Sequence, residues 1–250
     1  MRAYWTLTRR ELGGYLLSLT GYIIIAAGLF MMGFSFVIML LKLQQEPTPV
    51  PVTEMFYNTQ FFWLILLLST PVITMRLFAL ERFSGTYETL MTTPVSEFQV
   101  VLAKFSAALI FHALMWIPLL GCIFIVRYYT GDPTAFDLGA VGSTYLGILL
   151  LGGVFLSLGC CASALTRSQV AAAMMGLVFG VSVFLLAYLA DKQPEPANWQ
   201  AQALACFALF DQMRDFARGV IDTRAVVLLA SVTMFFLVLT LRIVESRRWR

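Results

Sequence analysis

Few side chains in this 250-residue chain are placed where they could perform covalent chemistry. The sequence has no GxxxxGKS/T phosphate loop, no HExxH zinc motif, no GxSxG nucleophile elbow and no cysteine pair with zinc-site spacing. His112 is the one ionisable residue, cysteines and tyrosines apart, deep in an apolar stretch. Such a residue is a functional candidate, but a single imidazole serves equally well as a hydrogen-bonded contact between helices. We therefore expect no enzymatic activity and no bound metal or cofactor in this chain.

Polar side chains gather instead in one segment, residues 78–95. They combine charges, small hydroxyl groups and a glycine: Glu81, Arg82, Ser84, Gly85, Thr86, Glu88 and, at the far end, Pro94. We predict a short helix over Thr86–Met91 that Pro94 ends, because the residue before a proline disfavours helical backbone.

The helix that follows this segment has a well-specified start. Ser96 is a candidate N-cap, and Gln99 stands at the position of its capping-box partner. Capping of this kind fixes the angle between the polar segment and the helix behind it. The segment would then act as a lever if another protein pushed on it.

A second polar group lies nearer the carboxyl end of the chain. Asp211 and Arg214 are three residues apart, as are Asp215 and Arg218. This spacing predicts an amphipathic helix with two ion pairs. The helix would lie at the interface on the outer, extracytoplasmic side of the membrane that the chain spans. The alternative is a re-entrant element that closes the outer end of a pathway, which requires protein or water to satisfy its backbone.

The elements that position these residues are membrane spans. The chain is 60% apolar and 12% charged, half the usual charged fraction of a soluble domain. Crossing the hydrocarbon takes about 20 apolar residues per helix, and six charge-free windows have that length or nearly so. The fold class we predict is an all-α polytopic membrane protein, one transmembrane domain over residues 1–250, with spans at about 20–41, 56–76, 97–126, 138–166, 169–190 and 223–244.

The basic residues predict how the chain is oriented. With the N-terminus inside, 11 of the 17 Lys and Arg fall in inner segments and 6 in outer ones. The positive-inside rule then places both termini in the cytoplasm. The net charge of +3 is explained by this distribution and implies no nucleic-acid partner. Residues 1–16 are expected to form an interfacial helix, with a frayed tail as the alternative.

Several motifs together resemble a known family. The segment from Pro71 through Met75-Arg76, the run Glu81-Arg82-x-Ser84-Gly85-Thr86-x-Glu88, Thr93-Pro94-Val95 and Ala103-Lys104-Phe105 is similar to the signature of ABC-2 type transporter permease subunits. Residues 215–222 (DFARGVID) and 245–250 (ESRRWR) resemble more narrowly the gliding-motility-type permeases.

The resemblance implies partners that the residues alone leave open. Two six-span permease subunits, identical or different, would pair with two ATPase subunits in a bacterial inner membrane, and ATP and Mg²⁺ would bind to the ATPases. The segment Leu80–Met91 would be the coupling helix, with Glu81, Arg82 and Glu88 as its polar contacts. Without an ATPase, the same charges would be a solvated loop.

The resulting functional hypothesis is the permease subunit of an ATP-driven exporter, surrounded by membrane lipid and with a possible auxiliary extracytoplasmic subunit. One alternative is a mechanotransmitting or scaffold membrane subunit that moves no solute itself. Another is an ATP-independent carrier or an intramembrane enzyme. The 21 Phe and 12 Met suit an apolar cargo but suit lipid-facing helices equally well, so the sequence leaves the substrate open.

Overall fold

Helices account for all the regular secondary structure in the described part of the chain. The computed structural model describes residues 2–45, 52–57, 59–85, 95–130, 137–191 and 208–246. Within these ranges, six helical stretches are long and apolar enough to cross a membrane: Leu19–Lys42, Gln60–Ser84, Glu97–Tyr129, Leu138–Leu165, Gln169–Asp191 and Thr223–Ser246. The predicted all-α polytopic membrane fold with six spans is confirmed.

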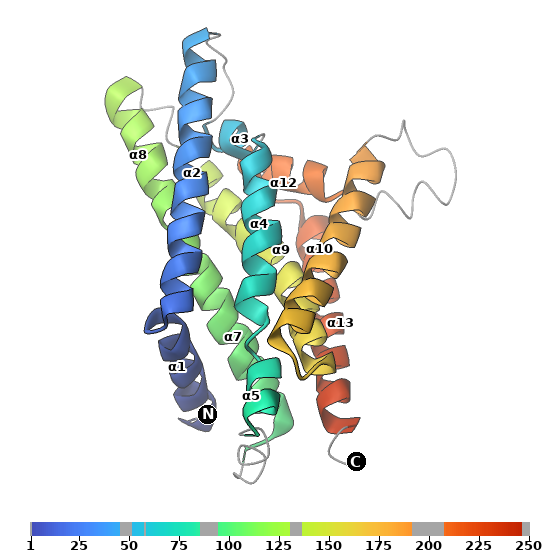
Figure 1. Ribbon diagram of the computed structural model, residues 1–250. Coiled ribbons are helices and arrows are strands. Elements are labelled where there is room, and N and C mark those ends of the chain that lie inside the picture. The colour runs from blue at the N-terminus through green and yellow to red at the C-terminus, as the bar shows by residue number, and fades with distance from the viewer. Residues whose placement is uncertain are drawn as a thin grey trace, which may run out of the picture.

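The two ends of the bundle carry different helices (Figure 1). One end carries both termini together with α1 (Arg2–Leu16) and α5 (Ala79–Ser84). The opposite end carries α3 (Val52–Tyr57) and α12 (Leu209–Ala217). Since the basic residues predict that the termini are cytoplasmic, we call the first end the inner end and the second the outer end.

Besides α5, which is the inner end of the second span, the described parts of the spans comprise seven helices. In chain order they are α2 (Leu19–Gln45), α4 (Gln60–Thr74), α7 (Glu97–Trp116), α8 (Pro118–Thr130), α9 (Leu138–Leu165), α10 (Gln169–Asp191) and α13 (Thr223–Ser246).

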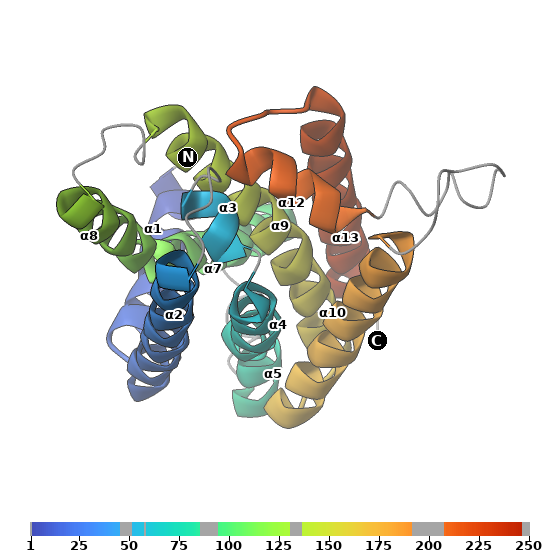
Figure 2. The same ribbon diagram turned by 90° about the horizontal axis from the view of Figure 1, so that it is seen from above.

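Helix α9 is the core of the bundle, with neighbours on all sides (Figure 2). In its most apolar 18-residue stretch, 83% of the residues are buried, against 22% and 17% in the corresponding stretches of α10 and α13. Two glycines permit the closest approaches. A Cβ atom at Gly152 would overlap the imidazole of His112 on α7, and one at Gly159 would overlap Thr74 on α4. Small residues at such positions let membrane helices pack closely.

Two predicted spans are divided in the structure. The third, predicted as one stretch over 97–126, is broken at Ile117 into α7 and α8, because Pro118 cannot donate a backbone hydrogen bond and begins the new helix. The second, predicted from residue 56, begins at Gln60, since residues 56 and 57 belong to α3.

The N-terminal segment is one continuous helix, which excludes the frayed tail. Side chains of α1 at helical spacing, Tyr4, Thr8, Glu11 and Tyr15, face the bundle and are buried or half-buried. The Tyr4 hydroxyl donates to Ser106 on α7 at 2.7 Å, and the Tyr15 hydroxyl donates to the Ile73 carbonyl of α4 at 2.8 Å. Burial raises the pKa of Tyr15 well above its usual value, which keeps it a neutral donor. Helix α1 is thereby fixed to the inner end of the bundle.

Candidate functional site

The short helix α5 is held in place by α9. Its N-cap residue, Phe78, offers no side-chain hydrogen bond. The hydroxyl of Ser163 instead accepts from the backbone N–H groups of Phe78 and Ala79, each at 3.1 Å. At the other end of α5, the Arg82 guanidinium donates to the Ala164 carbonyl. Two adjacent residues of α9 thus satisfy groups at both ends of α5.

A group of four charges links α5 to α1 and α7. We call Arg10, Glu11, Glu81 and Lys104 the charge cluster. The Lys104 ammonium lies 2.9 Å from Glu81 and 3.1 Å from Glu11, and the Arg10 guanidinium lies 3.2 Å from Glu81. The formal charges sum to zero, as expected where ions leave water.

Burial is uneven within the charge cluster. The Lys104 side chain is 2% exposed and also lies 5.6 Å from the ring centroid of Phe78, whereas the Arg10 side chain is 59% exposed. The cost of desolvation therefore falls mainly on Lys104 and Glu81, which need each other as partners. A displacement of α5 cannot leave α7 behind without separating this buried pair.

The residues predicted to form the coupling segment divide into a described and an undescribed part. Glu81 is 8% exposed and its carboxylate lies inside the charge cluster, so it faces the bundle. Helix α5 ends at Ser84, and Gly85 follows with a φ of 72°, the left-handed conformation that glycine adopts without strain. Thr86, Glu88, Pro94 and the helix predicted over Thr86–Met91 lie outside the described residues.

The predicted start of α7 is present. Ser96 is its N-cap, and its hydroxyl accepts from the backbone N–H of Gln99 at 3.3 Å. Glu97 supplies a negative charge in the first turn, where the helix dipole favours it. The polar segment therefore joins a helix whose first turn has a defined conformation.

The charge cluster itself was not predicted from the sequence. Glu11 and Lys104 are 93 residues apart, and Arg10 and Glu81 are 71 apart, so no local spacing indicates their contact. The signal available was Lys104 itself, a cation followed by 22 charge-free residues. The contact of Ser163 with α5 had no signal in the sequence, because Ser163 is one of a run of small residues.

At the outer end, α12 lies across the bundle beside α3 (Figures 1 and 2). Its apolar face, which includes Met213 and Phe216, is buried, and Asp211 is exposed on the other face. The hydroxyl of Ser143 on α9 donates to the Phe216 carbonyl at 2.6 Å. Of the two interpretations, this arrangement favours the amphipathic helix over the re-entrant one.

One of the two ion pairs predicted in α12 is replaced by a longer-range pair. Asp211 and Arg214 form the predicted pair at 3.2 Å. Arg218 instead pairs with Glu54 of α3, with nitrogen-to-oxygen distances of 2.7 and 2.9 Å, and no Asp215–Arg218 pair forms among the described residues. The bidentate geometry explains the preference, because two parallel hydrogen bonds to a buried carboxylate outweigh one exposed contact. The Glu54 hydrogen bond raises the pKa of Arg218.

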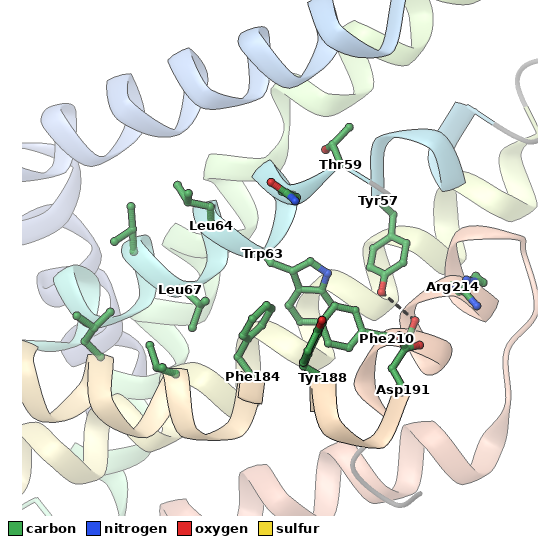
Figure 3. A pocket seen from close by; sticks show the side chains of 14 residues that line it. Tyr57, Thr59, Trp63, Leu64, Leu67, Phe184, Tyr188, Asp191, Phe210 and Arg214 are labelled. Atoms are coloured by element: carbon green, nitrogen blue, oxygen red, sulfur yellow. Dashed lines mark hydrogen bonds between the residues drawn. The ribbon is translucent and has the colours of Figure 1, made fainter. Parts of the chain in front are cut away.

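A groove of about 550 Å³ runs from α12 down between α4 and α10 (Figure 3). The residues on each wall recur every three or four positions, so each wall is one face of a helix. The α4 wall consists of Gln60, Trp63, Leu64, Leu67 and Leu68, and the α10 wall of Leu177, Val181, Phe184, Tyr188 and Asp191. Tyr57, Thr59, Phe210 and Arg214 complete the outer end.

His112 lies in a packing site between α7 and α9. Its Nε2 accepts from the indole N–H of Trp116, one turn along α7, at 3.2 Å, and the imidazole fills the space that Gly152 leaves. The described residues contain no group of His, Cys, Asp or Glu suited to a metal ion. Of the two interpretations of His112, these contacts favour the helix contact.

Comparison with known proteins identifies the family. The model of the family described as "ABC-2 family transporter protein" matches residues 41–242, which is most of the chain and includes all the elements from α3 to α12. No curated protein matches the sequence. With six apolar spans and a match over this length, the chain belongs to the ABC-2 family of transporter membrane proteins.

Proposed function

We propose that this chain is the permease subunit of an ATP-driven exporter and that a separate ATPase subunit docks on the segment that follows α5. Membership of the ABC-2 family supports the transporter part of this proposal. The sequence has no phosphate loop, so nucleotide hydrolysis requires a partner chain. A permease pair, two ATPases and a bacterial inner membrane complete the proposed assembly.

The observation that carries the proposal is the attachment of α5 to three other helices. Lys104 connects it to α7, Arg10 connects it to α1, and Ser163 with Ala164 connects it to α9. A short helix at the membrane surface with no other function would not need a buried ion pair, which is expensive to desolvate.

These contacts suggest how force passes through the chain. An ATPase that closes on nucleotide would displace residues 85–95, and α5 would move with them. The Glu81–Lys104 pair would transfer the displacement to α7, and the Ser163 and Arg82 hydrogen bonds would transfer it to α9. Glu81 and Arg82 are then positioning residues inside the permease, and Glu88 remains the candidate docking contact.

Two variants separate docking from transmission. In detergent, with the cognate ATPase co-expressed, Glu88→Lys should reduce the amount of ATPase that co-purifies. Glu81→Gln should leave that amount unchanged but abolish the increase in ATP hydrolysis that the permease causes, because the link to Lys104 is weakened. Glu245→Gln, in an exposed pair with Arg242 at the same end, is the control. Full binding and full stimulation in both test variants would refute the proposal.

A mechanotransmitting subunit is the second candidate, favoured by the outer end. Helices α3 and α12 are tied together by Glu54 and Arg218 and rest on α9, so motion of α9 would reach a surface that an extracytoplasmic partner could bind. Substrate flux in proteoliposomes that contain permease and ATPase alone would exclude this alternative.

A further inference from the structure

The groove between α4 and α10 changes in chemistry along its length. Toward the middle of the membrane its walls are aliphatic, with Leu67, Leu68, Leu177 and Val181. Toward the outer end it becomes aromatic and then charged. An apolar slot with a polar mouth complements an amphiphile, whose head and tail demand the same two environments.

Aromatic rings form the wall just below the mouth (Figure 3). Trp63 lies 4.4 Å from Phe210 and 5.6 Å from Phe184, centroid to centroid. All three side chains line the groove, with Trp63 edge-on to Phe184 and tilted against Phe210. Tyr188, 48% exposed, continues the wall on α10. Faces of Trp, Tyr and Phe attract ammonium groups.

Two charged side chains stand at the mouth. Asp191 ends α10, is exposed and has no ion pair within the described part of the chain. Arg214 is held by a single exposed pair with Asp211 on its own helix, an interaction of small net energy. Tyr57 lies near both charges, and its hydroxyl donates to the Phe210 carbonyl at 2.9 Å. Burial raises the pKa of Tyr57, the positive charge of Arg214 opposes that rise, and the negative charge of Asp191 adds to it.

We propose that this groove binds a zwitterionic phospholipid of the outer leaflet. Its ammonium lies between the Asp191 carboxylate and the aromatic wall, its phosphate lies at Arg214, and one acyl chain runs along the leucines of α4. The charges at the mouth favour this occupant. Asp191 has no cation paired to it in the described part of the chain, and Arg214 is held only by its pair with Asp211. Together they match a head group that carries one ammonium and one phosphate. This site is independent of ATPase docking at the inner end.

The surroundings of the groove supply the lipid. Leu64, Leu68 and Val181 on its walls are 37–46% exposed, so the slot is open at the side where a bilayer would lie. Water would find too few polar partners along the aliphatic part to fill it stably.

Quenching of Trp63 fluorescence by brominated lipids tests the site in the full-length chain. The other four tryptophans, Trp5, Trp116, Trp199 and Trp249, are replaced by Phe, and the protein is placed in nanodiscs that contain either dibromo-phosphatidylethanolamine or dibromo-phosphatidylglycerol with identical chains. The ethanolamine lipid should reach half-maximal quenching at about fivefold lower mole fraction, the ratio expected for one exposed charge contact. Asp191→Asn should remove this preference, because it removes the partner of the ammonium.

Asp222→Asn is the matched control. Asp222 lies at the same end, outside the groove, and Asn retains its capping contact to the Arg224 N–H. Equal quenching by the two lipids, or a preference that survives in Asp191→Asn, would overturn the proposal. So would the absence of quenching by either lipid, which would mean that a second copy of the chain covers the groove.

Native mass spectrometry of the chain with all its tryptophans tests the same site if the Trp-to-Phe background does not fold. Phosphatidylethanolamine should be retained by the parent and by Asp222→Asn, and lost from Asp191→Asn. Retention of this lipid by all three proteins, or by none of them, would contradict the assignment of its ammonium to Asp191.

Discussion

Lys104 is the single residue on which the inner end depends most. Its ammonium lies close to both Glu11 and Glu81, and its side chain is almost fully buried. A Met at this position would fill the same volume but leave two carboxylates without their buried partner. We therefore expect Lys104→Met to lower the free energy of unfolding by about 3 kcal/mol, a typical loss when one member of a buried pair is removed.

Thermal unfolding of the purified protein in detergent measures this effect. Arg10→Gln is the comparison, because Arg10 belongs to the same cluster but is largely exposed, and its loss should cost at most about 1 kcal/mol. Equal losses of stability in the two variants would show that burial of Lys104 does not determine the energy of the cluster.

His112 and Gly152 form a pair in which one residue makes room for the other. Gly152→Ala would place a methyl group in the volume of the imidazole, so the variant should lose about 1–3 kcal/mol of stability by overpacking. His112→Ala in the same chain should recover part of that loss, because the methyl group then occupies vacated space.

A double-mutant cycle on melting temperatures measures this coupling. Additive losses in the double variant would mean that the two residues do not compete for space. If instead His112→Ala alone abolished transport while leaving the protein folded, His112 would have a role beyond packing.

Residue-level prediction from the sequence succeeded where the partner is local. The Ser96 cap and the Asp211–Arg214 pair follow from spacings of three residues, and both are present. The Asp215–Arg218 pair follows from the same rule and is wrong, because Arg218 reaches Glu54, 164 residues away. Spacing rules describe what a helix offers by itself, and a buried carboxylate from elsewhere in the fold can outcompete it.

At the scale of elements, α12 depends on its connection to α3. Arg218 binds Glu54 in two places, and the hydroxyl of Thr53 donates to the Ala217 carbonyl at 2.6 Å. Gly219, with a φ of 90°, then turns the chain toward α13. Arg218→Met should loosen this attachment and speed amide hydrogen exchange in both α3 and α12.

Hydrogen exchange read out by mass spectrometry resolves these helices as separate peptides. Arg214→Gln is the control, because it removes a cation from the same helix but no ion pair with α3, and exchange in α3 should change far less than in Arg218→Met. Unaltered exchange in Arg218→Met would show that packing of Met213 and Phe216 on α9 is sufficient to hold α12.

Proline had different consequences in two spans, which limits what the sequence can predict about helix breaks. Pro71 lies inside α4, and that helix continues past it. Pro118 begins α8 after a break at Ile117, and the Tyr145 hydroxyl of α9 donates to the nearby Trp116 carbonyl. The Tyr145 hydroxyl that satisfies the Trp116 carbonyl at the break comes from another helix, so the local sequence around Pro118 does not predict it.

At the scale of the whole molecule, the distribution of charge remains the basis for orientation. Eleven of the 17 basic residues occupy the segments that we assign to the inner end, and both termini lie at one end of the bundle. Fusions at either terminus to a reporter that fluoresces only in the cytoplasm should therefore be bright. Fusion in the 192–207 connection should be dark, and the opposite pattern would invert the inner and outer ends.

The six-span architecture could be predicted from charge-free windows because the hydrocarbon imposes length and apolarity on each helix independently. The arrangement of the spans could not, since it depends on which small residues of α9 meet which neighbours. The two ends show the same contrast. The polar segments that compose them are evident in the sequence, but their contacts join residues 71 to 164 positions apart.

The charge cluster also has a consequence for the order in which the protein is made. Glu11 is synthesised 93 residues before Lys104, and at about 5–20 residues per second the ribosome needs roughly 5 to 20 s to cover that distance. During this interval the N-terminal helix has no lysine to bind, and the first two spans enter the bilayer without it. We therefore expect α1 to lie in the headgroup region until the third span arrives, because the charge cluster can form only after nearly half the chain has been translated. The contacts of α5 with Ser163 and Ala164 form later still.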